Sequence, residues 1–150
     1  MRYYSAITKG YGELHGEEQK RKLRLIKEQV GLPGSVLDLG GGHGLAKQFF
    51  RTLTVDPTWE GLSPGDVCGT AEWLPFRDKS FDHVLCLTAI HHCDLEGAIK
   101  EIRRVCRGKG VVTVLKKAKG FTKIVARLHQ AFALEEIEDE HDLILYGPLA

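Results

Sequence analysis

The sequence predicts an α/β fold in which a parallel sheet carries helices on both faces. Apolar runs alternate along the chain with amphipathic stretches of helical character. Residues 80–90 form a continuous apolar run with β-branched side chains, which is typical of a strand buried on both faces. A glycine-rich bend at residues 40–44 follows another short apolar run. In such folds the crossovers are right-handed, and ligands bind beyond the carboxyl ends of the strands.

Length, charge and cysteine usage narrow the class of protein. The 150 residues fit one domain, so we predict a single domain over 1–150. Lys and Arg number 21 against 20 for Asp and Glu, so net charge does not indicate a nucleic acid or membrane partner. The four cysteines lack CxxC spacing and are interpreted as reduced thiols. Neither a signal peptide nor a membrane-spanning run is found in the sequence, which predicts a cytoplasmic location and no membrane partner.

Residues 13–30 are predicted to form an amphipathic helix. Leu23, Ile26 and Val30 have the spacing of one apolar face, and the GLPG sequence at 31–34 ends the helix. The basic residues are interpreted as the solvent-exposed side of this helix: Lys20, Arg21, Lys22, Arg24 and Lys27.

The next elements are short. Residues 35–44 (SVLDLGGGHG) predict a strand that enters a tight bend, and residues 45–53 (LAKQFFRTL) have the composition of a helix. Residues 53–57 and 65–71 are predicted to contain the second and third strands. The segment between them, rich in Gly and Pro, leaves scarcely any room for a helix.

The second half of the chain continues the alternation. Residues 94–106 predict a core-facing helix with Asp94 as its N-cap, after the central strand at 80–90. A strand from residue 111 and a helix over 121–132 follow. Residues 133–147 are predicted to form a closing hairpin around His141 and Asp142.

The bend after the first strand indicates a ligand site. Gly40, Gly42 and Gly44 give the spacing GxGxG, whereas the dinucleotide fingerprint would require a third glycine where Leu45 stands. Asp56 ends the second strand, where an acidic side chain in such folds meets the hydroxyls of a ribose. The pattern favours an adenosine ligand. The alternative is a glycine-rich turn in which Asp56 only caps the turn after it.

Together these segments resemble the class I S-adenosylmethionine-dependent methyltransferases, and within them the methyltransferase type 11 group. The resemblance covers roughly residues 10–117 and rests on VLDLGGGHG, TVDP, GTAEWLPFRDKSFDHVLCLTAIHH and AIKEIRRVCRGKG. It implies a Rossmann-like, mostly parallel sheet of seven strands in the order 3-2-1-4-5-7-6, here in a minimal version. It also implies that the N-terminal helical segment, residues 1–30, packs near the cofactor.

The resemblance also implies a cofactor site. The three glycines of the bend would face the methionine part of S-adenosylmethionine, and Asp56 would hold the ribose. Thr70 stands where the family has an aspartate. The full set of implied cofactor contacts is Tyr11, Asp38, Gly40, Gly41, Gly42, Gly44, Asp56, Pro57, Thr70, Ala71, Glu72, Leu87 and Thr88.

Methyl transfer from a sulfonium depends mostly on positioning, with a general base needed only when the acceptor is protonated. His91, His92 and Asp94 follow the central strand and are the candidates for a base or for acceptor contacts. The alternative is that both imidazoles only bond backbone groups. A metal site formed with Cys93 is disfavoured because adjacent residues rarely converge on one ion.

The sequence does not identify the methyl acceptor. The short link between the second and third strands predicts an open pocket, which suits a macromolecular acceptor such as RNA or protein, or a partner subunit. Basic residues that could meet a phosphate, or form a solvated face, are Lys116, Lys117, Lys119, Lys123 and Arg127. The sequence thus predicts a methyltransferase with an unidentified acceptor. Alternatives are a cofactor-binding regulatory or partner subunit and a nucleotide-dependent oxidoreductase.

Overall fold

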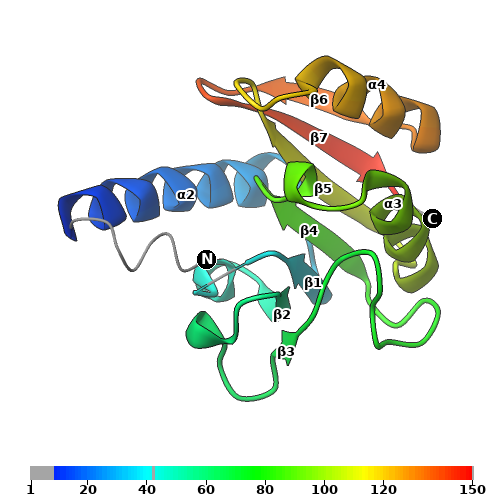
Figure 1. The fold of residues 1–150 in the computed structure, drawn as a ribbon, viewed down its shortest axis with the longest axis horizontal. Helices are drawn as coiled ribbons and strands as arrows, with labels where there is room; N and C mark the ends of the chain where they lie inside the picture. The colour runs from blue at the N-terminus through cyan, green and yellow to red at the C-terminus, as the bar shows by residue number, and fades with distance from the viewer. Residues whose placement is uncertain (1–8, 42, 150) are drawn as a thin grey trace.

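The structure is a computed structural model that describes residues 9–41 and 43–149, with side chains for all of these except residues 9–15 and 91. Its strands form one sheet in the order β3-β2-β1-β4-β5-β7-β6 (Figure 1). The strands β1 to β5 pair in parallel, and β7 runs antiparallel to both β5 and β6. The strand bounds are Ser35–Leu39 (β1), Arg51–Asp56 (β2), Val67–Cys68 (β3), His83–Leu87 (β4), Lys109–Leu115 (β5), Glu135–Glu138 (β6) and Asp142–Pro148 (β7). The predicted strand order is confirmed.

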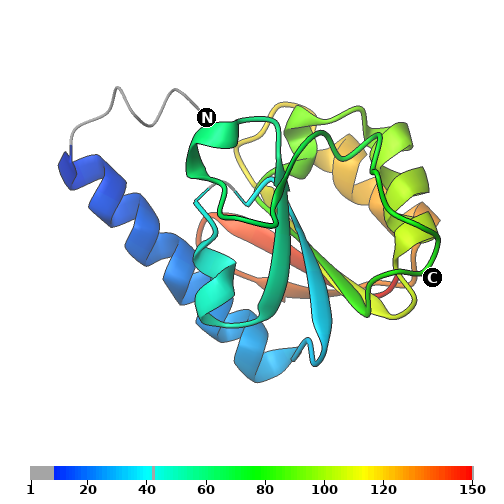
Figure 2. The same ribbon diagram turned by 90° about the horizontal axis from the view of Figure 1, so that it is seen from below.

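The helices cover both faces of this sheet, as predicted. The long helix α2, Lys9–Gln29, lies on one face, and α3, Leu95–Val105, and α4, Phe121–Ala131, lie on the other (Figure 2). Three short 3-10 helices complete the described elements: η1 (Leu45–Gln48), η2 (Trp59–Gly61) and η3 (Ile90–His92). Among the described helices, none has the length and apolar character needed to cross a bilayer.

Alternating side chains of the central strands divide the core in two. Val84 and Cys86 of β4 are buried with α3 and α4, whereas Leu85 between them is buried with α2. This follows from the pleat, because successive side chains of a strand point to opposite faces. A continuous apolar run is therefore the pattern that a strand covered on both faces requires.

The apolar stripe of α2 is confirmed, but one residue of its basic run is not where the sequence analysis placed it. Leu23 and Ile26 are fully buried, with Val30 packed beside them. Lys22, expected on the solvent side, is only 3% exposed. Its ammonium group is bonded to Asp142 on β7, which provides a partner for a charge that would otherwise be too costly to bury.

The prediction of a helix over residues 45–53 is wrong. Only η1 forms, and the strand β2 already begins at Arg51, which pairs with Ser35 of β1. Phe49 and Phe50 pack into the cluster beneath α2, so a single turn is enough to return the chain to the sheet. The residues have the composition of a helix, but the connection from β1 to β2 is too short to contain more than the single turn of η1.

The helix α3 follows its prediction closely. The side chain of Asp94 caps it by accepting a hydrogen bond of 3.2 Å from the amide of Gly97. The residues on its inner face are buried: Ala98, Ile99, Ile102 and Val105. The hairpin predicted around His141 and Asp142 is also confirmed, as β6 and β7.

Candidate functional site

A pocket of about 1220 Å³ opens at the carboxyl ends of β1, β2 and β4. Pockets for one small ligand typically measure roughly 300 to 1,000 Å³, so this one is larger than a single small ligand requires. The bend after β1, the end of β2, residues 69–72 and residues 86–89 form one part of its wall. The inner face of α2 and the start of β7 form the other part, with Gln19, Lys22, Leu115, His141 and Asp142.

The glycine-rich bend is shaped by close contacts with its own neighbours. Gly40 has φ of 71°, and a Cβ atom there would lie 2.6 Å from the Cβ of Ala89. A Cβ atom on Gly41 would collide with the carboxylate of Asp38. The amide of Gly40 donates to the carbonyl oxygen of Val55 at 2.7 Å. The bend is therefore held tightly between β2 and the segment after β4, and both glycines line the pocket.

Asp38 is the buried anchor below this bend. It is 1% exposed, and its Oδ2 accepts a hydrogen bond of 3.2 Å from the hydroxyl of Thr54. Burial raises the pKa of Asp38 to about 7, because removal from water disfavours the charged form. This carboxyl group can thus change its protonation state near neutral pH.

Asp56 lies at the end of the adjacent strand, on the pocket wall. It is 4% exposed, and its Oδ1 accepts a hydrogen bond of 2.9 Å from the amide of Thr58. Pro57, Thr70, Ala71 and Glu72 line the same part of the pocket. All of these residues were predicted to contact the cofactor, and the fold brings them together with the bend.

The end of β4 carries a strained residue. Thr88 has φ of 56°, a left-handed conformation that β-branched residues rarely adopt. Its amide donates to the hydroxyl of Thr113 at 2.7 Å, which holds this conformation in place. Residues with such backbone strain cluster at functional sites. Leu87, Thr88 and Ala89 all line the pocket.

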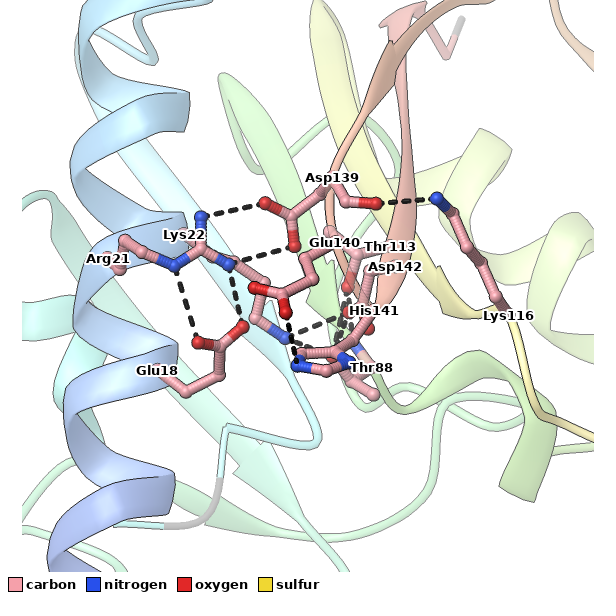
Figure 3. A network of polar contacts seen from close by, with 10 residues as sticks. All are labelled: Glu18, Arg21, Lys22, Thr88, Thr113, Lys116, Asp139, Glu140, His141 and Asp142. Atoms are coloured by element: carbon pink, nitrogen blue, oxygen red, sulfur yellow. Dashed lines mark hydrogen bonds and ion pairs between the residues drawn. The ribbon is translucent and has the colours of Figure 1, made fainter.

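Thr88 belongs to a buried polar network that the sequence analysis did not foresee (Figure 3). Lys22 Nζ donates to Asp142 Oδ2 at 2.8 Å and to Thr88 Oγ1 at 3.1 Å, and Thr88 Oγ1 donates to Asp142 Oδ2 at 2.8 Å. One signal was present, because Lys22 precedes Ile26 by four residues and so shares the apolar face of α2.

An outer set of contacts holds the same hairpin against α2 (Figure 3). Arg21 donates to both carboxylate oxygens of Asp139, at 2.8 and 3.0 Å, and also pairs with Glu18. The Arg21 guanidinium lowers the pKa of Asp139. Lys116 Nζ donates to the carbonyl oxygen of Asp139 at 2.6 Å. The turn between β6 and β7 is thus fixed to α2 and to the end of β5.

The other predicted site residues are placed differently. His92 is exposed and lines the pocket, whereas Asp94 is the N-cap of α3 and lies outside the lining. Gly44 has φ of 72° as the N-cap of η1, also outside the lining. Gly42 lies outside the described residues, and the side chains of Tyr11 and His91 are outside them as well.

The predicted basic patch is partly paired with acidic residues. Two members of the predicted basic patch form ion pairs, Lys116 with Glu138 and Arg127 with Glu96, both at 2.7 Å. Within the part of the chain that the structure describes, no three His, Cys, Asp or Glu side chains are arranged to hold a metal ion. The four cysteines are all free thiols.

Comparison with known sequences gives a family match. Residues 37–114 match the family described as Methyltransferase domain. Malonyl-[acyl-carrier protein] O-methyltransferase of Pseudescherichia vulneris is 30% identical over 134 residues, which are 79% of this chain and 52% of that protein. The chain spans about half the length of the curated relatives that it matches, with shares of 48% and 56% for two uncharacterized proteins of Methanocaldococcus jannaschii.

Solved structures share the fold. A protein of Pyrococcus horikoshii OT3 superimposes with a TM-score of 0.74 at 18% identity, over 99% of this chain and 98% of that one. The 1,6-didemethyltoxoflavin-N1-methyltransferase of Burkholderia thailandensis, solved with 1,6-didemethyltoxoflavin and S-adenosylhomocysteine, gives a TM-score of 0.63 at 18% identity. That match covers 84% of this chain and 75% of the other.

Proposed function

Since the chain belongs to the class I S-adenosylmethionine-dependent methyltransferases of the type 11 group, we propose that its pocket binds S-adenosylmethionine and catalyses methyl transfer to an acceptor bound beside it. The observation that carries the proposal is one continuous pocket that joins the glycine-rich bend and Asp56 to the end of β4. When bound, S-adenosylmethionine supplies a methyl group activated by a positively charged sulfur. The protein then has to bind the two reactants, orient them and exclude water from the pocket.

The residues on the β1–β2 side of the pocket fit such a group. The buried carboxylate of Asp56 accepts hydrogen bonds, which suits the paired hydroxyls of a ribose. Pro57 and Ala71 offer an apolar wall for a base, and the bend brings backbone close to the ligand. The proposed contacts in full remain Tyr11, Asp38, Gly40, Gly41, Gly42, Gly44, Asp56, Pro57, Thr70, Ala71, Glu72, Leu87 and Thr88.

The acceptor would bind next to the end of β4. His92 lines the pocket there and is exposed, so it is placed to contact an acceptor or remove its proton. His91 stays a prediction beside it. Asp94 already serves α3 as its cap, so an additional catalytic role would have to compete with that hydrogen bond. An RNA or protein acceptor, or a partner subunit that covers the pocket, remains part of this proposal.

A matched pair of glycine variants tests the cofactor site. Gly40 and Gly120 both have positive φ, 71° and 79°, so an alanine at either position meets the same kind of backbone strain. The added Cβ meets Ala89 at the pocket wall in one case and nothing within 4 Å in the other. Titration calorimetry with S-adenosylhomocysteine should therefore show at least about tenfold weaker binding for Gly40→Ala than for Gly120→Ala, equivalent to about 1.4 kcal/mol.

Equal affinities of the two variants would contradict the assignment of the bend as the cofactor site. Circular dichroism of both variants controls for folding. Tight binding of S-adenosylhomocysteine without methyl transfer to any RNA, protein or small-molecule fraction would favour the alternative, a cofactor-binding subunit that has no catalysis of its own.

A further inference from the structure

The buried network around Lys22 contains a carboxylate oxygen that the fold leaves unused. Asp142 is fully buried, and its Oδ2 accepts hydrogen bonds from both Lys22 and Thr88 (Figure 3). Within the described part of the chain, its Oδ1 has no hydrogen-bond partner. Buried acceptors are nearly always satisfied in folded proteins, so an orphaned carboxylate oxygen calls for a partner beyond the described residues, such as a bound ligand.

This oxygen belongs to a residue of the pocket wall, and a second acceptor accompanies it. Gln19 lies three residues before Lys22, on the same face of α2, and its Oε1 is also buried without a partner among the described groups. Gln19, Lys22 and Asp142 all line the pocket. A ligand that satisfied both oxygens would have to present hydrogen-bond donors to this side.

The network is distant from the side assigned to the nucleoside. Three strands, β1, β4 and β5, separate β2 from β7 in the sheet, so the two lie four strand spacings apart, roughly 19 Å at about 4.8 Å each. Asp56 ends β2, and Asp142 begins β7. A ligand on Asp142 would thus occupy the part of the pocket beyond the end of β4, where the acceptor is expected.

The charges of the site indicate which chemical groups the ligand can carry. Lys22 and Asp142 neutralise one another at 2.8 Å, so the site has no excess positive charge to attract an anion. A carboxylate or phosphate can only accept hydrogen bonds and would face the lone pairs of Asp142 Oδ1. An ammonium, an N–H or an O–H group would be complementary to it.

We propose that Asp142, assisted by Gln19, is the specificity-determining residue for the methyl acceptor, and that it selects an acceptor with an amine or hydroxyl donor group. The inference rests on the proposed function. Lys22 and Thr88 orient the Asp142 carboxylate by holding Oδ2, which leaves Oδ1 to accept a hydrogen bond from a ligand. Gln19 adds a second hydrogen bond from α2.

Asp142→Asn tests this by exchanging an acceptor for a donor. With its amide oxygen kept by Lys22 and Thr88, the new NH₂ group would take the place of Oδ1, and Lys22 would lose its counter-charge. We would titrate benzylamine and benzoate into the protein saturated with S-adenosylhomocysteine, and follow both probes by ligand-observed NMR. Wild type should bind benzylamine in preference to benzoate, and Asp142→Asn should weaken benzylamine at least about tenfold and reverse the preference.

Gln19→Leu serves as a second variant, because it removes no bond that the described residues make to Gln19 Oε1. It should weaken benzylamine about threefold and leave the affinity for S-adenosylhomocysteine within twofold of wild type. Benzylamine binding that neither variant changes would overturn the inference, as would benzoate binding to wild type as well as benzylamine does.

A tenfold loss of S-adenosylhomocysteine affinity in Asp142→Asn would also overturn it, since Asp142 would then belong to the cofactor site. Failure of wild type to bind S-adenosylhomocysteine at all is a distinct result, which would refute the proposed function and, with it, this inference.

Discussion

The two sides of the pocket are built in different ways. On the glycine-rich side, Asp38, Gly40 and Gly41 stand within four residues of one another, and Gly41 packs directly against Asp38. On the α2–β7 side, Lys22 and Asp142 are 120 residues apart and meet only because the last strand returns beside β5. A local motif can be predicted from the sequence, whereas a site formed by residues far apart in the chain can be identified only once the fold is known.

The two sides also handle buried charge differently. Among the described residues, Asp38 accepts a hydrogen bond from the Thr54 hydroxyl and has no ion pair, and burial raises its pKa to about 7. Asp142 is equally buried but is paired with Lys22. One side thus depends on a proton and the other on a counter-charge, and substitutions should separate these two dependencies.

The largest effect is expected at the buried ion pair. Lys22→Met removes the counter-charge and leaves the Asp142 carboxylate buried beside Thr88, so the free energy of unfolding should fall by about 3 to 5 kcal/mol. Urea denaturation followed by circular dichroism measures it.

The double variant Lys22→Met, Asp142→Leu is the control, because replacing both members of a buried pair by apolar residues is often neutral. It should recover most of the loss. A single variant as stable as wild type would show that the pair contributes nothing to the α2–β7 side.

The next effect concerns pH and the glycine-rich side. The pKa of Asp38 rises from 3.8 to about 7 on folding, so the carboxyl stays protonated in the folded protein over a range where it ionises in the unfolded chain. Its contribution to stability is therefore fully present below about pH 4 and is lost as the pH rises to about 7. At about 1.4 kcal/mol per pKa unit, the loss is at most about 4 kcal/mol.

Asp38→Asn should abolish this component. The difference in unfolding free energy between wild type and Asp38→Asn, measured by urea denaturation from pH 4 to pH 8, should shift in favour of the variant as pH rises. A difference that is constant with pH would mean that Asp38 ionises normally in the folded protein. Taking this difference cancels carboxylates such as Asp139, whose lowered pKa acts in the opposite direction.

The smallest effect on the free energy of unfolding is expected at Arg21, the neighbour of Lys22 in the sequence. The side chain of Arg21 is 43% exposed, so its bridge to Asp139 is screened by water and salt. Arg21→Ala should lower the unfolding free energy by only about 1 kcal/mol, and less in 1 M NaCl. A loss as large as that of Lys22→Met would remove the contrast between the outer and buried contacts of α2.

The sequence predicted the elements with strong local signals. Asp94 as a cap, the two-faced burial of β4 and the gathering of Asp56 beside the bend all follow from spacing or strand order. The sequence-based prediction failed where tertiary contacts determine the structure. Lys22 was predicted to be solvent-exposed because its partner, Asp142, is remote in sequence. Residues 51–53 belong to β2 because this strand pairs with β1 from Arg51 onward. The strained Thr88 depends on Thr113 of another strand.

Calorimetric titration of the purified chain with S-adenosylhomocysteine and, separately, with NADH tests the central claim most directly. Because GxGxG replaces the dinucleotide spacing at the bend, S-adenosylhomocysteine should bind with a dissociation constant in the micromolar range, about −8 kcal/mol, and NADH should give no heat of binding. Binding of NADH instead, or of neither compound, would contradict the assignment of this pocket to S-adenosylmethionine.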